Sequence, residues 1–217
     1  MVNLGGVAAG LRVKVGPMRL GGLAFRILSL ADRDQHHDPD GLAASRGVPP
    51  AHWGFFGWVW PSGVRLADLV GAHALAGRRI LEIGGGLSLA GLVAAARGSD
   101  VTASDLHPRA ADFLAANTRL NGLRPIPFRE IDWRSPPAAL GRFDLVLASD
   151  VLYEPGHPDA IARFAEAHLA PDGELLLVDP GRGRVGRLTR LLGARGFARA
   201  EVLPRARGSA SSFTRPS

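Results

Sequence analysis

The chain has 217 residues, of which 46% are hydrophobic and 21% charged, a composition typical of a globular protein and not of a disordered one. It contains no cysteine, which excludes a disulfide framework and a thiolate metal site, and leads us to expect a cytoplasmic protein. The first residues lack the basic and apolar regions of a signal peptide, and no apolar run approaches the roughly 18 residues of a membrane helix. We therefore expect no membrane partner.

The formal net charge of +6 raises the question of a nucleic-acid partner. Lys14 is the only lysine, so nearly all the positive charge is arginine, in a chain also rich in Ala, Gly and Pro. The arginines are spread along the chain, although six of them lie in residues 182–199. We interpret the charge as chiefly compositional, and expect a monomer for which nucleic acid is not the principal substrate.

The N-terminal part predicts a hairpin followed by a loop. Residues 11–30 show apolar alternation, a break at Gly16-Pro17 and a second extended run, which together predict a β-hairpin. Residues 31–52 form a polar loop rich in Pro and Asp, whose acids and adjacent histidines match no calcium or zinc spacing. We expect residues 1–52 to form an N-terminal extension without a metal site.

Helices and strands alternate from residue 62 onward. The patterns predict a helix over residues 61–75 with Ser62 as its N-cap, a helix over 88–98, and a helix from Pro108 to Gly122. Two further helices are expected near residues 157–169 and 184–195. Strands are predicted over residues 78–84, 100–105, 126–133, 143–150, 173–180 and 197–203. This alternation predicts an α/β domain over residues 53–217, with a doubly wound, mostly parallel sheet that binds ligands at the carboxyl ends of its strands.

Three glycines, Gly84 to Gly86, lie between a predicted strand and a predicted helix. Such a turn either binds a nucleotide-like ligand or is only a tight structural turn. Glu82 lies just before the glycines, and Asp105 ends the next strand, where an acid can accept the hydroxyls of a ribose. A dinucleotide fingerprint fails because its third glycine position holds Leu89, and an acid at the turn would repel phosphate. A cationic ligand with a ribose fits better, and S-adenosylmethionine is such a ligand.

The same stretch resembles the first motif of class I, or seven-β-strand, S-adenosylmethionine-dependent methyltransferases. Four segments in order resemble the family 16 lysine methyltransferases: WVWPSGVRLADLV, RRILEIGGGLSLAGLVAAARGSDVTASD, EIDW and DLVLASDVLYEP. The segment LLVDPGR adds similarity to the subgroup that methylates the electron-transfer flavoprotein β subunit, and to its bacterial relatives. The resemblance covers roughly residues 53–182. It departs from the family at Ser88, where a glycine is usual, and we interpret Ser88 as the N-cap of the following helix.

The resemblance implies a seven-stranded Rossmann-like sheet and S-adenosyl-L-methionine as cofactor, and it assigns positions to cofactor contacts. Glu82, Gly84 and Gly86 line the methionine moiety, and Asp105 holds the ribose. The other implied cofactor residues are Trp60, Asp132, Trp133 and Ser149.

The resemblance also suggests residues around the adenine, and most of the aromatic positions have two interpretations. The resemblance implies that Asp132 accepts a hydrogen bond from the adenine amino group, and that Trp133 covers the adenine ring; the alternative for Trp133 is simple core packing. Four aromatic residues of segment 53–58 either pack the extension on the sheet or form an approach to the methyl group: Trp53, Phe55, Phe56 and Trp58.

The D-x-x-Y signature of the family corresponds to Asp150 and Tyr153, after the fourth strand and beside the transferable methyl group. Asp150 can orient an ammonium, and Tyr153 can stack on its alkyl stem or on the cation. The alternative is a capping acid with a surface aromatic. Asp179 and Arg182 should face the same opening, where Arg182 can clamp an acidic group of the substrate. The alternative there is a tight turn with a solvated arginine.

We therefore predict a protein-lysine N-methyltransferase with Asp150 and Tyr153 as its catalytic residues. Two alternatives remain open. One is an N-methyltransferase acting on a small molecule of the nicotinamide type or on a protein N-terminus. The other is a non-catalytic module that binds the cofactor and mediates an interaction.

Overall fold

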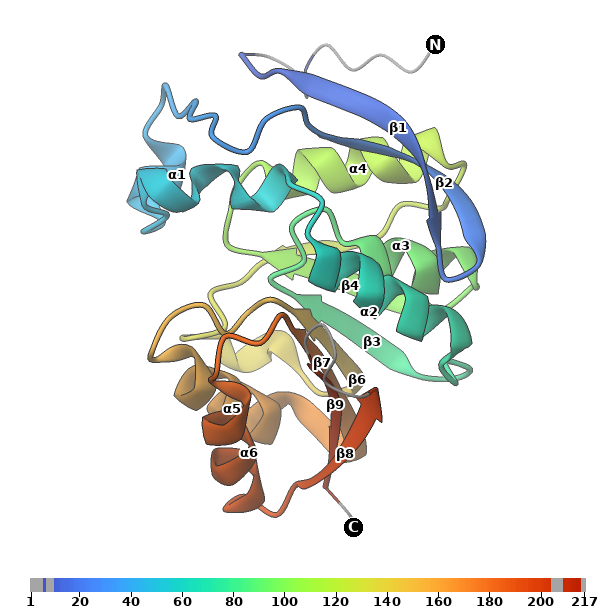
Figure 1. Ribbon diagram of the computed structural model, residues 1–217, viewed down its shortest axis with the longest axis vertical. Coiled ribbons are helices and arrows are strands. Elements are labelled where there is room, and N and C mark those ends of the chain that lie inside the picture. Colours follow the sequence, from blue (N-terminus) through green and yellow to red (C-terminus); the bar gives the residue numbers. More distant parts are fainter. Residues whose placement is uncertain (1–5, 7–9, 204–208, 216–217) are drawn as a thin grey trace.

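A seven-stranded sheet of order β5-β4-β3-β6-β7-β9-β8 forms the centre of the protein in a computed structural model that describes residues 6, 10–203 and 209–215 (Figure 1). The beginning of the predicted extension, residues 1–5 and 7–9, therefore lies outside the described residues. Strand β9 pairs antiparallel with both neighbours, and the other pairings are parallel. The strands are β3 (Arg79–Ile83), β4 (Asp100–Asp105), β5 (Phe128–Glu130), β6 (Phe143–Ser149), β7 (Leu169–Asp179), β8 (Ala198–Leu203) and β9 (Ser209–Thr214). The predicted α/β fold with a mostly parallel sheet is confirmed.

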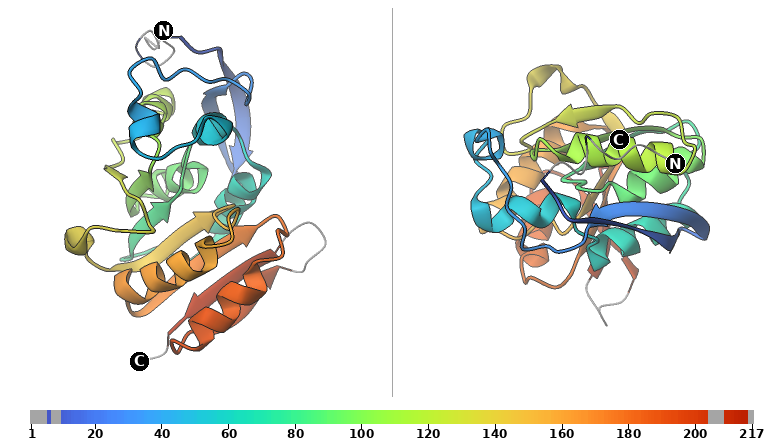
Figure 2. Two further views of the ribbon diagram at one scale, coloured as in Figure 1. Left: turned by 90° about the vertical axis from the view of Figure 1, so that its left-hand side faces the viewer. Right: turned by 90° about the horizontal axis from the view of Figure 1, so that it is seen from above.

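Helices cover both faces of the sheet, and β6 shows why both faces are apolar. Leu145 and Leu147 belong to one buried cluster, while Val146 and Ala148 belong to the other, as the alternation of side chains along a strand requires. The first face carries α2 (Pro61–Ala72), α3 (Leu89–Ala96) and α4 (Ala110–Leu120). The second carries α5 (His157–His168) and α6 (Val185–Gly193), which lie side by side in Figure 2.

The predicted N-terminal hairpin is confirmed, but the predicted position of its break is wrong. Strands β1 (Val13–Leu20) and β2 (Leu23–Leu30) pair antiparallel around a turn at Gly21 and Gly22, whose φ angles are 57° and 81°. Gly16-Pro17 lies inside β1. Proline is tolerated there because β1 is an edge strand that pairs only with β2 among the described strands.

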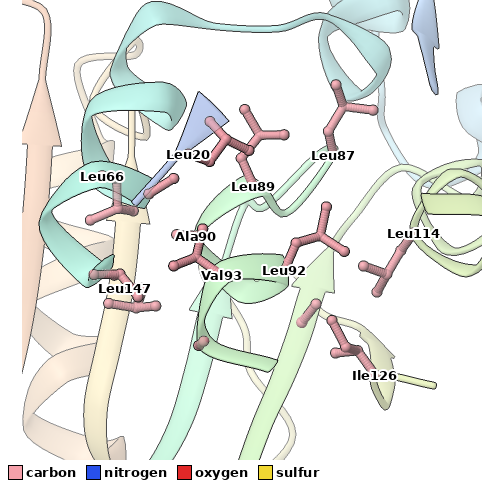
Figure 3. Close-up of a cluster of buried hydrophobic side chains, with 14 of the residues drawn as sticks. Leu20, Leu66, Leu87, Leu89, Ala90, Leu92, Val93, Leu114, Ile126 and Leu147 are labelled. Atoms are coloured by element: carbon pink, nitrogen blue, oxygen red, sulfur yellow. The ribbon is translucent and has the colours of Figure 1, made fainter. Parts of the chain in front are cut away.

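The hairpin shares its apolar core with the rest of the domain. Figure 3 shows Leu20 at the end of β1 beside Leu66 of α2 and Leu89 of α3. All three side chains are less than 5% exposed, and they belong to the larger of two buried clusters. This cluster is continuous across the predicted boundary between residues 52 and 53.

The structure corrects three local predictions. The segment predicted as a loop contains α1 (Leu42–Ser45) and leads into a 3-10 helix, η1 (Pro50–Gly57). Ser62 lies inside α2, whose N-cap is Trp60; the proline that follows Trp60 suits the first helical position because it has no N–H to leave unbonded. Strand β9 was not predicted.

Ser88 does take the predicted N-cap position of α3, but its side chain makes no capping hydrogen bond. Its φ of 51° lies in the left-handed region, where glycine is unstrained.

No helix among the described residues is long and apolar enough to cross a membrane. Within the same residues, no group of three or more His, Cys, Asp or Glu side chains could hold a metal ion.

Candidate active site

A cavity lies at the carboxyl ends of the parallel strands, where the sequence predicted a ligand. Its walls come from segment 47–60, the glycine loop after β3, and the loops after β4, β5, β6 and β7. Eleven of the twelve predicted site residues line it: Trp60, Glu82, Gly84, Gly86, Asp105, Asp132, Trp133, Ser149, Asp150, Tyr153 and Arg182. The exception is Asp179.

The glycine loop is built for close approach. Gly84 and Gly86 have φ angles of 56° and 54°, in the left-handed region that favours glycine. A β-carbon on Gly86 would lie 2.8 Å from the carbonyl oxygen of Phe56, so only glycine lets η1 pack against this loop. The loop and η1 therefore form adjoining walls of the cavity.

Glu82, at the end of β3, is a buried carboxyl group that faces the cavity. Its side chain accepts a hydrogen bond from the backbone N–H of Gly91 at 2.8 Å and another from the Ser88 hydroxyl. Burial outweighs these bonds and raises the pKa of Glu82 to about 8. A cationic ligand beside Glu82 would favour its ionised form, so the position suits an ammonium or a sulfonium.

Asp105, at the end of β4, presents a carboxylate held by the backbone. One oxygen accepts from the N–H of Gly86 and the other from the N–H of His107, both at 2.8 Å. Burial raises the pKa of Asp105 above its ordinary value. Each oxygen keeps a further acceptor position, which suits the two hydroxyls of a ribose.

His107 also lines the cavity, although no sequence pattern predicted it as a site residue. Its ring stacks on Phe56 with centroids 4.0 Å apart, and its Nδ1 accepts a hydrogen bond from the N–H of Arg109. Burial lowers the pKa of His107 to about 3, so the ring is neutral and its proton is on Nε2. Nε2 is buried and has no partner among the described residues. Its place two residues after Asp105 was the only signal in the sequence.

Asp132 and Trp133 line the side of the cavity formed after β5. Asp132 makes a two-pronged pair with Arg134, at 2.8 and 2.9 Å. Burial opposes ionisation of Asp132, but the hydrogen bonds and charge of Arg134 outweigh it and lower the pKa. Trp133 is 8% exposed, packs in the second apolar cluster and contacts His157 edge-on. It thus packs in the core and lines the cavity at once.

An aromatic wall, made of His52, Phe55, Trp60 and Tyr153, lines part of the cavity. His52 stacks on Phe55 at 4.8 Å, and Phe55 meets Trp60 and Tyr153 edge-on at 5.3 and 6.2 Å. Trp58 also lines the cavity, whereas Trp53, at 1% exposure, belongs to the core. Of the four aromatic residues of segment 53–58, Trp53 therefore packs in the core, while Phe55, Phe56 and Trp58 line the cavity.

Asp150 follows β6 in a conformation that is unusual for a residue with a side chain. Its φ is 57°, and its N–H donates to the carbonyl oxygen of Val178 at 2.9 Å. Its Oδ1 accepts a hydrogen bond from Nε of Arg182 at 2.7 Å. Tyr153 lies three residues on, 36% exposed, and burial raises its pKa to about 12, so its hydroxyl stays protonated. Asp150 and Arg182 are thus paired in the lining of the cavity, which also contains Tyr153.

Asp179 supports the turn that carries Arg182. Its side chain is fully buried, and its Oδ1 accepts from the N–H groups of Gly181 and Arg182 at 2.8 and 2.9 Å. Arg182 therefore lines the cavity, whereas Asp179 is buried under the turn and does not face the cavity as the sequence predicted.

A family model described as a methyltransferase domain matches residues 64–210. The chain belongs to this methyltransferase family. It is 36% identical over 105 residues to the histone-arginine methyltransferase METTL23 of Xenopus laevis, covering 45% of each protein. It is 27% identical over 135 residues to the electron transfer flavoprotein beta subunit lysine methyltransferase of Mus musculus, covering 60% of this chain and 51% of that protein. The matches thus span about half the length of these curated relatives.

The solved structures agree on the fold. The Thermus thermophilus 16S rRNA N2 G1207 methyltransferase, solved with AdoMet and guanosine, superposes with a TM-score of 0.67 at 18% identity. The match covers 94% of this methyltransferase and 51% of that chain. The predictions of the family, of the class I fold and of S-adenosylmethionine as the cofactor are confirmed. The glycine loop, the buried Glu82 and the bonded Asp105 fit that cofactor.

Proposed function

We propose that this methyltransferase transfers the methyl group of S-adenosylmethionine to a lysine side chain of a protein. The observation that carries the proposal is the position of Asp150, whose carboxylate opens into the same cavity as Glu82 and Asp105. A carboxylate in this cavity attracts a cationic side chain toward the cofactor. The similarity to a lysine methyltransferase over 60% of the chain supports lysine as the acceptor.

The walls of the cavity suit the parts of the cofactor one by one. The carboxylate of Glu82 is suited to the ammonium of the methionine moiety, and Asp105 to the ribose hydroxyls. Trp133 offers an indole to the adenine, with Asp132 as the acceptor for its amino group. Trp60 and Ser149 complete the same cavity. Gly84 and Gly86 let the backbone approach without side chains in the way.

Methyl transfer to an amine requires little acid or base chemistry from the protein. The bound cofactor supplies an electrophilic methyl group on its sulfonium, and the acceptor must be a neutral amine in line with it. Asp150 orients the amine, while Tyr153 and the aromatic wall pack on the alkyl stem and exclude water. The lysine proton leaves on desolvation or through water, so Asp150 is a positioning group and not an assigned base.

Arginine is the second candidate acceptor. Asp150 holds a guanidinium in this structure, that of Arg182, at 2.7 Å. One of the relatives is named as a histone-arginine methyltransferase. A site that accommodates the internal guanidinium has the chemistry for an arginine substrate as well.

The test is incubation of the purified chain with radiolabelled S-adenosylmethionine and a size-fractionated host lysate. We expect label in a discrete protein band, and hydrolysis of that band to release methyllysine. Methylarginine would favour the second candidate. Label confined to small molecules, or equal labelling by wild type and Asp150→Asn, would refute protein methylation at this site.

A further inference from the structure

Arg182 lies where a substrate cation is expected. Its Nε donates to Asp150 at 2.7 Å, and both residues line the cavity that contains Glu82 and Asp105. Only 12% of the Asp150 side chain is exposed. A substrate amine that enters the cavity therefore meets a carboxylate that already holds a cation.

The carboxylate of Asp150 is fixed by the backbone, and the arginine side chain that pairs with it is partly exposed. Asp150 is held in a left-handed conformation by its hydrogen bond to Val178. Arg182 is 36% exposed and lies between two glycines, Gly181 and Gly183, with φ angles of 99° and 78°. A β-carbon at either glycine would have no atom within 4 Å, so the turn is uncrowded. The side chain of Arg182 thus borders solvent, into which its guanidinium can turn when it leaves Asp150.

We propose that Arg182 is a displaceable internal cation, which the substrate amine replaces on Asp150 while the released guanidinium pairs with a carboxylate of the substrate. The inference rests on the proposed function and narrows its substrate class to lysines with an acidic side chain nearby.

The exchange has a simple electrostatic reason. Before binding, Asp150 and Arg182 neutralise one another; after the exchange, each is paired with a group of the substrate. A substrate that lacks the carboxylate breaks the charge-assisted hydrogen bond between Asp150 and Arg182, and leaves the guanidinium without a new partner from the substrate. Arg182 therefore weakens binding of every lysine substrate, and an adjacent acid compensates for it.

The experiment uses the full chain, radiolabelled S-adenosylmethionine and synthetic peptides with one central lysine. The peptides form matched pairs, in which one member carries a single Glu and the other a single Gln at the same position. The position beside the lysine differs from pair to pair. The variants are Arg182→Gln, Arg182→Lys and Arg190→Gln. Arg190 is the control because it is an exposed arginine of α6 that does not line the cavity, and its replacement changes the net charge equally. Melting temperatures show that each variant is folded.

For at least one Glu position, wild type should methylate the Glu peptide with a kcat/KM about tenfold higher than its Gln partner, the scale of one charge-assisted hydrogen bond, chiefly through KM. Arg182→Gln should lose this preference and methylate the Gln peptides with a lower KM than wild type does. Arg182→Lys should keep part of the preference, and Arg190→Gln all of it.

Two results would overturn the inference alone: equal use of Glu and Gln peptides by wild type, or an undiminished preference in Arg182→Gln. Absence of label from every peptide and from the proteins of the lysate would refute the proposed function and the inference with it.

Discussion

Asn117 of α4 pairs with the backbone of Leu28 in β2 as a neighbouring strand would. Its Oδ1 accepts from the N–H of Leu28 at 2.7 Å, and its Nδ2 donates to the carbonyl oxygen of Leu28 at 3.1 Å. Both residues are completely buried. One helical turn on, Asn121 makes the same pair of contacts with Arg26, at 2.8 and 2.9 Å, but on the exposed side. Two asparagines one helical turn apart thus join β2 to α4, and each pairs with the N–H and the carbonyl of one residue of β2.

We expect Asn117→Ala to lower the free energy of unfolding by about 2–3 kcal/mol, because it leaves the buried N–H and carbonyl of Leu28 without partners. At this chain length the melting temperature should fall by roughly 5–10 °C. Asn121→Ala is the matched control: water can replace its side chain at Arg26, so its effect should stay below about 1 kcal/mol. Equal losses in the two variants would contradict the importance of burial.

Much of this fold follows from the sequence, and the failures have physical causes. The bounds of strand β4 were predicted to the residue because it stands between Gly98 and a turn that contains Pro108; the predicted helix start at Pro108 was wrong, since α4 begins at Ala110. Strand β9 was missed because its residues, SASSFT, are mostly small and polar, and they form a strand only between β7 and β8. The 3-10 helix η1 was missed because PAHWGFFG has no helical or strand period.

The sequence predicted the positions of the acidic residues in the cavity, but not which side chains contact one another there. Glu82 and Asp105 lie at the ends of β3 and β4, and Asp150 directly follows β6. The alternation of helices and strands places these strand ends together. The contact between Asp150 and Arg182 joins residues 32 apart in the chain, and the packing of His107 on Phe56 joins a strand end to the extension. Contacts of this kind depend on the packed structure and leave no local pattern.

Glu82 predicts a pH dependence of cofactor binding. Its pKa of about 8 means that below pH 8 the ligand-free protein carries a proton there, which a cationic ligand must expel. Affinity for S-adenosylhomocysteine should therefore rise up to about tenfold per pH unit between about pH 6 and 7.5, where the α-ammonium of the ligand stays charged. Calorimetry in buffers of different ionisation enthalpy should show release of about one proton.

The matched variant is Glu82→Gln, which should bind more weakly above pH 7 and release no proton. It should also gain stability. Between the usual glutamate pKa and pH 8, folded Glu82 keeps a proton that the unfolded chain has lost, so its contribution to stability falls as pH rises. The melting temperature of ligand-free Glu82→Gln should therefore exceed that of wild type by a margin that grows toward pH 8. A pH-independent margin would contradict the raised pKa.

Two substitutions at Ser88 distinguish the effect of backbone strain from that of its hydrogen bond to Glu82. Its left-handed φ of 51° strains a residue with a β-carbon, while its hydroxyl stabilises the ionised form of Glu82. Ser88→Gly should add about 1 kcal/mol of stability, and shift the pH dependence of cofactor binding to higher pH. Ser88→Ala should show the same pH shift without the gain in stability. Thermal melts and calorimetry on both variants test this, and equal stabilities would exclude the strain.

Asp105 should control cofactor affinity and the choice of nucleotide. Asp105→Asn puts an amide donor opposite the N–H of Gly86 or His107 and removes a charged acceptor from the ribose position. We expect a loss of about 1.5–3 kcal/mol in binding of S-adenosylhomocysteine, measured by calorimetry. The wild-type protein should not bind NAD, because the acids of the cavity repel a pyrophosphate. Tight NAD binding would refute the assignment of Glu82 and Asp105.

Asp150 and Tyr153 should act on the substrate amine and not on the fold. Because Asp150 has a φ of 57°, which Asp and Asn tolerate better than Ala, Asp150→Asn is the informative change. It should reduce single-turnover methyl transfer by at least about 100-fold, roughly 2.7 kcal/mol of lost stabilisation, with cofactor affinity and melting temperature nearly unchanged. Asp150→Ala should in addition lose about 1–2 kcal/mol of stability because alanine is strained at this φ.

The two Tyr153 variants test the ring against its hydroxyl. The ring contacts His52, Phe55 and His157 edge-on, so a packing role predicts that Tyr153→Phe keeps most of the transfer rate and Tyr153→Ala loses it. Single-turnover rates, cofactor affinity and melting temperature measured on the same proteins distinguish the roles. A capping or core role for Asp150 and Tyr153 predicts the reverse ranking, in which stability falls by several kcal/mol while the rate per folded molecule is retained.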